Sequence, residues 1–413
     1  MDLTHRAALI RRFTPLMMQW GVTVYSAAVA LGLSVLFARS MGSTAFGHYT
    51  YISVLASFVV LAQDAGFNTL LMRERTAPSA TLKAHYDELP SIVLLHLFLT
   101  TALFMGLTVL LSRWLDGPSL IAGIFCFGTI TLTQWQSSWL KGAGHFDRDA
   151  IFLFCGRSVS ALLVLISVVC VGATPVSVFS AWGIGLLLSL ACFHKNIPPV
   201  IKVRWKLPTW AYRSSLSFFA AGLASTLYNQ IDIVMLRNTL GAVPAIGHYA
   251  VAARIYDGLL LLATPVVLML FRRMRALAMS PLGDCGFSLN AALGAFAIGT
   301  FLAVTGLLFG PWVISVLFGN TYAEGARAVV GLLFTALIFA LPNYVLGQSA
   351  IAMQQERWLA VCLFFAVVVN VLLNLYLIPF KGVEGAAWST LFTEMSLTVA
   401  LGWGLRKQLF KRA

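Results

Sequence analysis

Long apolar runs alternate with short polar connectors along almost the whole chain. A run of about 20 mostly apolar residues is long enough to cross a bilayer as a helix. Hydropathy therefore predicts an all-α integral membrane protein with about 12 transmembrane helices. The predicted spans are residues 13–37, 45–71, 89–112, 118–140, 150–171, 175–194, 211–236, 245–271, 287–309, 326–353, 358–378 and 383–405.

The composition excludes a water-soluble globular protein. Apolar residues make up 59% of the 413 positions, charged residues only 10%, and the mean hydropathy is +0.85. Soluble domains usually carry about 25% charged residues. The net charge of +13 would suggest nucleic acid binding in a soluble protein. In a membrane protein, basic residues in the loops on one side serve as topology signals. We therefore expect no nucleic-acid partner.

The basic residues gather on one side of the predicted membrane. With the N-terminus placed in the cytoplasm, 21 of the 28 Lys and Arg residues fall in cytoplasmic segments. The opposite side holds Arg39, Arg113, Arg237, Arg327 and Lys381, and only Arg157 and Arg254 remain inside spans. Cytoplasmic loops are enriched in Lys and Arg. We therefore expect a multi-pass membrane protein with both termini in the cytoplasm.

One short motif occurs twice, at the same topological point of the two halves of the chain. Phe46-Gly47-His48-Tyr49 begins the second predicted span, and Ile246-Gly247-His248-Tyr249 begins the eighth. Transporters built from parallel repeats place their substrate site at the repeat interface. The repeat predicts two pseudo-symmetric six-helix lobes, residues 1–194 and 211–413. A basic cytoplasmic linker, residues 195–210, joins them.

Six Asp, Glu and Arg side chains lie inside the predicted spans, away from the first and last few residues of each span. They are Asp64, Arg157, Asp232, Arg254, Asp257 and Glu394. A charge at the bilayer centre costs about 2.5–3.5 kcal/mol even on lenient insertion scales. Asn68 shares a helix face with Asp64, Asn229 shares one with Asp232, and Gln19 begins a further polar stripe. These faces occupy equivalent places in the two halves. We expect them to line one water-filled cavity.

Some of these charges have structural explanations in the sequence. Arg254 and Asp257 are three residues apart on a helix and can neutralise each other, even while they line a cavity. Asp232 lies close to Arg237, near a helix end, and the two could form an interfacial ion pair.

For the other three charged residues the sequence allows either a structural or a functional role. Arg157 can line the cavity or extend toward the cytoplasmic end of its helix. Glu394 can be a structural hydrogen-bond partner or a functional group. Asp64 has no cationic neighbour in the sequence, which favours a functional role.

The chain carries no motif of a known catalytic or metal centre. HExxH, the P-loop and GxSxG are all absent from the sequence. We expect no enzymatic activity, no catalytic residue, no metal site and no cofactor. Transport would then depend on H⁺ or Na⁺ coupling or on the gradient of the substrate.

Several segments resemble a known family. They include Leu36-Phe-Ala-Arg-Ser-Met-Gly42, Gln63-Asp64-Ala-Gly66-Phe67-Asn68, Asn229-Gln-Ile-Asp232 and Asn370-x3-Asn374-x3-Ile378-Pro379, with Glu394 where an acid is common. Their order and spacing resemble those of polysaccharide-synthesis flippases. These are the O-antigen and exopolysaccharide members of the multidrug/oligosaccharidyl-lipid/polysaccharide (MOP) superfamily. The resemblance covers nearly the whole chain.

The resemblance implies a fold, a substrate and a mechanism. It implies a V-shaped pair of six-helix lobes that work by alternating access. The implied substrate is a polyprenyl diphosphate-linked oligosaccharide, used in cell-surface polysaccharide biosynthesis. Family cavities are often cationic, so Arg254, Arg157 and Arg39 are the implied diphosphate contacts. The acids would pair with these arginines, contact sugar hydroxyls or carry a coupling cation. The implied partners are the lipid-linked oligosaccharide, membrane lipid and a polysaccharide polymerase.

Two other functions remain open. A cation-coupled multidrug exporter of the same superfamily would need an acid that organic cations can reach. A membrane glycosyltransferase or polymerase acting on the same lipids would usually carry a large outer loop. The short outer connectors of this chain argue against that reading.

Overall fold

The chain folds into α-helices throughout the part that the structure describes. The computed structural model describes residues 3–76, 87–114, 116–193, 207–241, 243–278 and 286–409. Residues 195–206, most of the predicted linker, lie outside these ranges. The described helices are α1 (Leu3–Asp64), α2 (Phe67–Thr76), α3 (Leu89–Leu110), α4 (Gly117–Gly142), α5 (Phe146–Cys170), α6 (Pro175–Cys192), α7 (Thr209–Leu240), α8 (Val243–Ala278), α9 (Phe287–Phe318), α10 (Asn320–Ala352), α11 (Glu356–Lys381) and α12 (Val383–Leu409).

Helix α1 contains two passes. Its 62 residues would measure about 90 Å as a straight helix, three times the roughly 30 Å of the hydrocarbon core. The helical geometry breaks at Gly42, with φ 75° and ψ 171°, where a residue without a β-carbon is favoured. The chain turns there, so the two arms of α1 correspond to the first two predicted spans.

The second predicted span ends earlier than hydropathy suggests. Residues 45–71 were expected to form one helix, but Ala65 and Gly66 adopt positive φ and separate α1 from α2. A β-carbon on Gly66 would lie 2.6 Å from the carbonyl oxygen of Ser215 and 2.7 Å from the nitrogen of Phe219. The break therefore lets the backbone of α7 approach closely, which hydropathy alone could not reveal.

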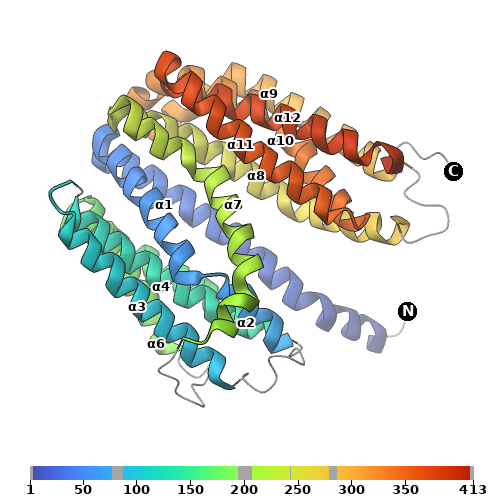
Figure 1. Cartoon of the computed structure of the whole chain (residues 1–413), viewed down its shortest axis with the longest axis horizontal. Helices are drawn as coiled ribbons and strands as arrows, with labels where there is room; N and C mark the ends of the chain where they lie inside the picture. The colour runs from blue at the N-terminus through green and yellow to red at the C-terminus, as the bar shows by residue number, and fades with distance from the viewer. Residues whose placement is uncertain are drawn as a thin grey trace. The chain divides into compact units, whose positions relative to one another are not determined.

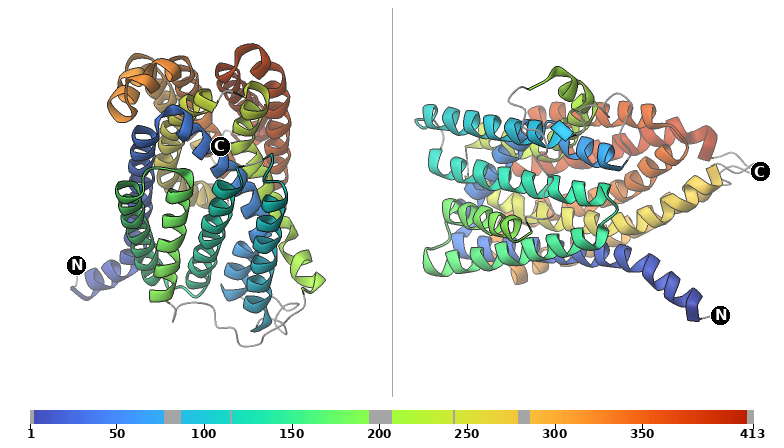
Figure 2. Two further views of the ribbon diagram at one scale, coloured as in Figure 1. Left: turned by 90° about the vertical axis from the view of Figure 1, so that its left-hand side faces the viewer. Right: turned by 90° about the horizontal axis from the view of Figure 1, so that it is seen from below.

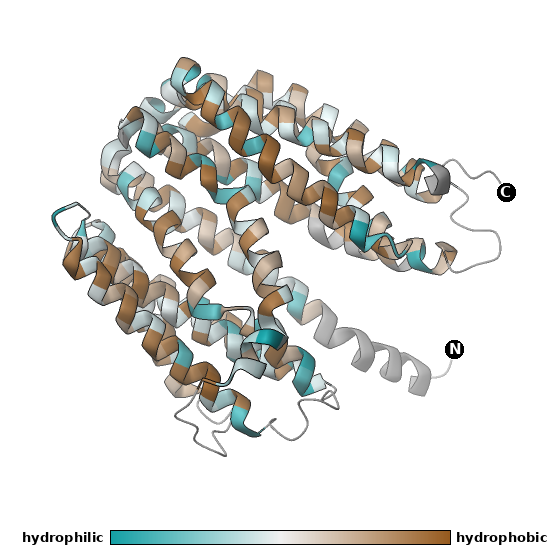
Figure 3. Cartoon of the chain, viewed as in Figure 1, coloured by the Kyte–Doolittle hydropathy of each residue, from teal (hydrophilic) through white to brown (hydrophobic). Residues whose placement is uncertain are grey.

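Apolar side chains cover most of the helix surfaces. Eight of the described helices are long and apolar enough to cross a membrane. Hydrophobic residues predominate along helices such as α3, α9 and α11 (Figure 3). The more polar helices α7, α8 and α12 carry Asp232, Asp257 and Glu394. With the two arms of α1, this pattern agrees with the expected set of twelve spans.

The helices pack into two compact units whose members are not simply the two halves of the sequence. Unit 1 comprises residues 1–33 and 52–226, and unit 2 comprises residues 34–51 and 227–413. The chain therefore passes between units three times. The Gly42 turn, defined here as residues 34–51, packs with unit 2, and the first part of α7 packs with unit 1. The lobe boundaries expected from the sequence stay a prediction.

In unit 1, helices α3 to α6 run alongside one another, and α2 packs on α3 and α4 (Figures 1 and 2). Phe67, Ile92 and Trp135 belong to its buried core, and Ala211 of α7 completes it. The imidazole of His96 is 2.8 Å from the hydroxyl of Tyr212. That contact ties α7 to α3.

In unit 2, α10 packs on α8, α9 and α12, and α11 packs on α12. The Gly42 turn is built into this unit. Its residues Phe37, Ala38 and Phe46 are at most 1% exposed. The hydroxyl of Tyr322 donates to the carbonyl of Ala38 at 2.9 Å, which fixes the turn to α10.

Candidate functional site

Asp64 caps a helix. Its carboxylate accepts hydrogen bonds from the backbone nitrogens of Gly66 (3.1 Å) and Asn68 (2.9 Å) and from the indole of Trp135 (2.7 Å). Aspartate is a preferred residue at helix N-termini because it satisfies free N–H groups there. Asn68 in turn accepts from Ser138 at 2.5 Å. The structure thus brings Asp64 and Asn68 together at the start of α2, bonded to α4.

Gln19 belongs to a partly buried polar network in unit 1. Its amide donates to the carbonyl of Phe146 and to the carboxylate of Asp149, each at 2.7 Å. Asp149 is 0% exposed, and the amine of Lys141 lies 3.4 Å from it. Sequence reasoning missed Asp149 because the predicted span began one residue later. The sequence feature that could have pointed to Asp149 is a pair of aspartates, Asp147 and Asp149, in the first turn of α5.

Arg157 is a half-buried cation in the membrane-spanning part of α5. Its electrostatic neighbour is the thiol of Cys126 on α4. Among the described residues, the Arg157 guanidinium has no hydrogen-bond acceptor and no ion-pair partner. A guanidinium carries five N–H donors that normally find acceptors when buried. Arg157 is therefore available to an anionic ligand.

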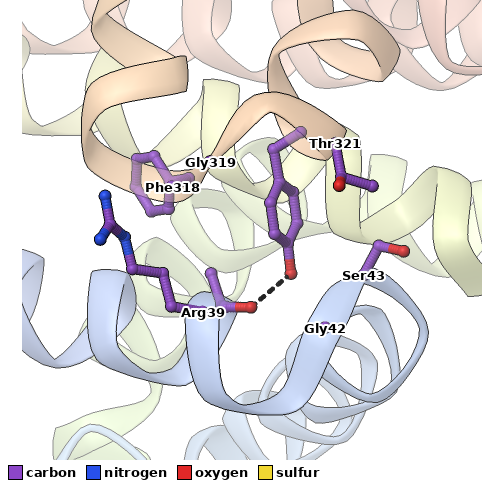
Figure 4. A pocket seen from close by; sticks show the side chains of 8 residues that line it. Arg39, Gly42, Ser43, Phe318, Gly319 and Thr321 are labelled. Carbon is purple, nitrogen blue, oxygen red and sulfur yellow. Dashed lines mark hydrogen bonds between the residues drawn. The ribbon is translucent and has the colours of Figure 1, made fainter.

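Arg39 binds the end of a helix. Its Nε donates to the carbonyl of Leu317 at 2.7 Å, and its Nη2 donates to the carbonyl of Val316. These are carbonyls of the last turn of α9, where a cation is favourable. Arg39 also borders a cavity of about 350 Å³ beside Ser43 and Thr321 (Figure 4). Two of its nitrogens are occupied by this cap.

Asp232 pairs with a tyrosine. The hydroxyl of Tyr249 donates to the carboxylate of Asp232, and the backbone nitrogen of Ile233 donates to it at 2.8 Å. Arg237 instead donates to the carbonyl of Gly241 at 2.8 Å. Of the possibilities that the sequence left open for Asp232, the ion pair with Arg237 is not formed in the structure, and Tyr249 instead links α7 to α8. The sequence placed Tyr249 in the repeated motif but did not identify it as this partner.

Two charged residues in the first half of α8, Arg254 and Asp257, belong to the same unit as Asp232. Arg254 is half-buried and Asp257 is exposed, and the two interact electrostatically. The charge of Asp257 also reaches Asp232 and Tyr256. Asn229 is exposed on α7. Unit 2 therefore holds one arginine and two carboxylates on this part of α7 and α8, and their role in lining a cavity stays a prediction.

Glu394 is buried at the centre of unit 2, with 6% of its surface exposed. Its carboxylate accepts from the hydroxyl of Tyr228 (2.6 Å), the amide of Asn343 (2.7 Å) and, more weakly, the hydroxyl of Tyr256 (3.5 Å). One side chain thereby joins α7, α8, α10 and α12. Sequence reasoning missed these three partners because they are uncharged. The sequence feature that could have pointed to them is a tyrosine in the middle of an apolar helix, because a buried tyrosine hydroxyl needs a hydrogen-bond partner.

The two units differ in chemistry. Unit 1 offers the unpartnered cation Arg157, while the carboxylates of unit 2 are held by tyrosines and by Arg254. No group of three or more His, Cys, Asp or Glu residues that could hold a metal occurs among the residues described. The arrangement offers a cation to an anionic ligand in unit 1 and hydrogen-bonded carboxylates in unit 2.

The sequence matches the model of a known protein family. Residues 18–274 match the family described as polysaccharide biosynthesis proteins. This is more than half of the chain. No curated protein matches the sequence.

Solved structures share the fold. The lipid II flippase MurJ in an inward closed conformation has a TM-score of 0.74 at 14% identity, over 94% of this chain and 87% of that one. An inward-facing multidrug resistance MATE transporter of the MOP superfamily has a TM-score of 0.71 at 14% identity, over 95% and 97% of the two chains. A MOP superfamily transporter from Pyrococcus furiosus, whose binding pocket is described as having reverse polarity, has a TM-score of 0.59 at 15% identity, over 97% and 95%. These likenesses confirm the expected fold of about twelve transmembrane helices.

Proposed function

The chain belongs to the family of polysaccharide biosynthesis proteins, and from that premise we propose that it is a flippase for a lipid-linked oligosaccharide. The substrate is a polyprenyl diphosphate that carries sugars, moved from the inner to the outer leaflet. The family resemblance seen in the sequence is confirmed by the match. The protein acts as a transporter rather than an enzyme, and it prepares the substrate for a polysaccharide polymerase.

The observation that carries the proposal is that the Arg157 guanidinium has no acceptor in the part of the chain that the structure describes. A cation at membrane depth costs free energy, so a guanidinium without an acceptor is best explained by an anion that it meets during function. Guanidinium groups match phosphate oxygens in a bidentate manner. Arg254, half-buried on α8, is the second diphosphate contact.

The remaining polar residues take different roles in this proposal. Arg39 and Asp64 act as helix caps, because backbone groups already occupy them. Asn229 and Asp257, which are exposed, contact sugar hydroxyls. Residues 1–194 and 211–413 form the two lobes of an alternating-access cycle in the bacterial inner membrane. Both termini lie in the cytoplasm, following the basic inner connectors.

Multidrug export is the main alternative, since one similar structure is a multidrug resistance transporter. An organic cation would need an accessible acid free of cationic neighbours. Asp64 is bonded to three donors, and Asp257 lies beside Arg254. The unpartnered charge of Arg157 would repel such a substrate. These observations favour the flippase. A membrane glycosyltransferase or polymerase is disfavoured by the short outer connectors.

Ligand binding by the purified full chain tests the proposal. We expect it to bind undecaprenyl diphosphate, the part common to all such substrates, and to bind ethidium, an organic cation, weakly. The double variant Arg157→Gln with Arg254→Gln should lose at least about 100-fold in affinity, because each charge-assisted contact contributes about 1.5–3 kcal/mol. The pair Arg113→Gln with Arg327→Gln, on the opposite side from most basic residues, is the matched control. Unchanged diphosphate affinity in the first double variant, or preferential binding of ethidium, would refute the proposal.

A further inference from the structure

Glu394 is a carboxylate at membrane depth with no cationic partner among the described residues. The groups that face it are Tyr228 of α7, Tyr256 of α8 and Asn343 of α10. All are neutral donors. Behind them, Tyr344 interacts electrostatically with Tyr228, and Asp257 with Tyr256. The charge of Asp257, which reaches Tyr256, is negative, and no residue in the described part of the chain forms an ion pair with Glu394.

The asparagine side of this site is fixed. The amide nitrogen of Asn343 donates both to the Glu394 carboxylate and, at 2.8 Å, to its backbone carbonyl. The amide oxygen of Asn343 accepts from Thr398 at 2.8 Å. Because both ends of the amide are occupied, Asn343 cannot turn without losing several bonds. A proton that reaches Glu394 must therefore bind Oε1, the oxygen that faces the two tyrosines.

Proton binding at Oε1 changes the bond to Tyr228. The Tyr228 hydroxyl now donates to this oxygen at 2.6 Å, as a charge-assisted bond. A protonated Oε1 carries its own hydrogen, so the hydrogen of Tyr228 has to turn away and its oxygen becomes the acceptor. The bond becomes a neutral one, roughly half as strong. The weaker donation from Tyr256 is lost as well.

The position of Tyr228 gives this change a consequence. The chain passes from unit 1 to unit 2 between Thr226 and Leu227, inside α7. Tyr228 is the second residue after that point, and its hydroxyl joins α7 to α12. We propose that Glu394 is the proton-binding residue of the transport cycle, and that its protonation loosens α7 where the chain passes between the units. The inference deepens the proposed flippase function and rests on it.

The geometry favours a proton over Na⁺. A hard cation needs several oxygen ligands that present lone pairs. Around Glu394 the neighbours present hydrogens, and the one amide oxygen, on Asn343, is already occupied by Thr398. Na⁺ would have to reverse three donors, whereas a proton requires the reorientation of the tyrosine hydroxyls alone.

Infrared titration of the full chain in lipid nanodiscs tests proton binding directly. We expect a pH-dependent band from a protonated carboxylic acid that disappears in Glu394→Gln. The matched control is Asp232→Asn, which removes a carboxylate that also accepts from a tyrosine, Tyr249. Persistence of the band in Glu394→Gln, or its loss only in Asp232→Asn, would overturn the assignment. Exchanging a Na⁺-free buffer for a Na⁺-containing buffer of the same pH should leave the band unchanged. Loss of the band on addition of Na⁺ would also overturn the assignment of a proton site.

Hydrogen exchange of α7 tests the mechanical step. Amides of residues 227–232 should exchange about tenfold faster at acidic than at alkaline pH, after correction for the intrinsic rate. Tyr228→Phe and Glu394→Gln should show the faster exchange at every pH. Equal corrected rates at both pH values would contradict the loosening of α7. Diphosphate binding is measured on the same samples. If the infrared band of Glu394 titrates as expected but the protein does not bind undecaprenyl diphosphate, only the proposed flippase function is refuted. If the protein binds the diphosphate but the band is absent, only the proton site at Glu394 is refuted.

Discussion

A β-carbon on Gly247 would lie 3.4 Å from the backbone nitrogen of Gly47. It would also overlap the carbonyl oxygen of Ser43. The two glycines are the equivalent residues of the repeated motif, so the two copies of that motif touch each other within unit 2. The motif therefore marks a helix contact that requires the absence of a side chain, in addition to marking an internal duplication.

Gly247→Ala should destabilise the protein by about 1–3 kcal/mol, because backbone atoms that cannot move aside fill the space of the new methyl group. Gly258→Ala, on the same helix, is the matched control, since nothing lies within 4 Å of its β-carbon position. The control should be neutral or stabilising by up to about 1 kcal/mol. Thermal unfolding of the purified proteins measures both. Equal stability of the two variants would show that the contact is not tight.

Asp64→Ala should cost about 1–3 kcal/mol in stability, because it removes the cap of α2 and leaves the indole of Trp135 without its acceptor. Asp64→Asn should recover most of that loss, since asparagine also caps helices well. Transport should survive in Asp64→Asn. A transport-dead but stable Asp64→Asn protein would instead indicate a role in coupling.

Arg157→Met should raise the thermal stability while it lowers diphosphate affinity. The substitution removes a cation without an acceptor from a membrane-spanning helix, a change of up to about 2.5–3.5 kcal/mol on insertion scales. Thermal unfolding and binding of undecaprenyl diphosphate are measured on the same preparation. A clear loss of stability would mean that Arg157 has a structural partner, and the ligand assignment would then lose its main support.

Arg39→Met should have the opposite signature. It removes the bonds to Leu317 and Val316 at the end of α9, so stability should fall by about 1–2 kcal/mol. The affinity for undecaprenyl diphosphate should stay within about twofold of the unaltered protein, since the guanidinium serves the helix end. A selective loss of affinity at normal stability would restore Arg39 as a diphosphate contact.

The sequence predicted the helices well because their signal is local. Each span is an apolar run of sufficient length, and the start of α9 agrees with the predicted span 287–309 to the residue. The break at Gly66 was missed because its cause, the close approach of Ser215, lies about 150 residues away in the sequence. The same limitation hid the packing of the Gly42 turn into unit 2.

The candidate site was predicted in part. The sequence identified Asp232, Arg254 and Asp257 from their cost in a bilayer, and the structure groups them in unit 2. It could not identify their neutral partners, because a tyrosine in an apolar helix carries no charge signal. Asp64 was favoured as functional because it lacks a cationic neighbour in the sequence. Backbone N–H groups stabilise it instead, and such donors leave no trace in the residue types.

Because the first part of α7 completes the core of unit 1, the order of synthesis matters. The space beside Phe67 and His96 is closed by residues 207–226, which leave the ribosome after the first six helices. The earlier helices can insert into the membrane one after another, but their packing has to wait for the seventh. A gene divided at the linker would therefore give an N-terminal fragment with an open core. Its C-terminal fragment would begin with a helix whose residues up to 226 have lost the unit that they pack against.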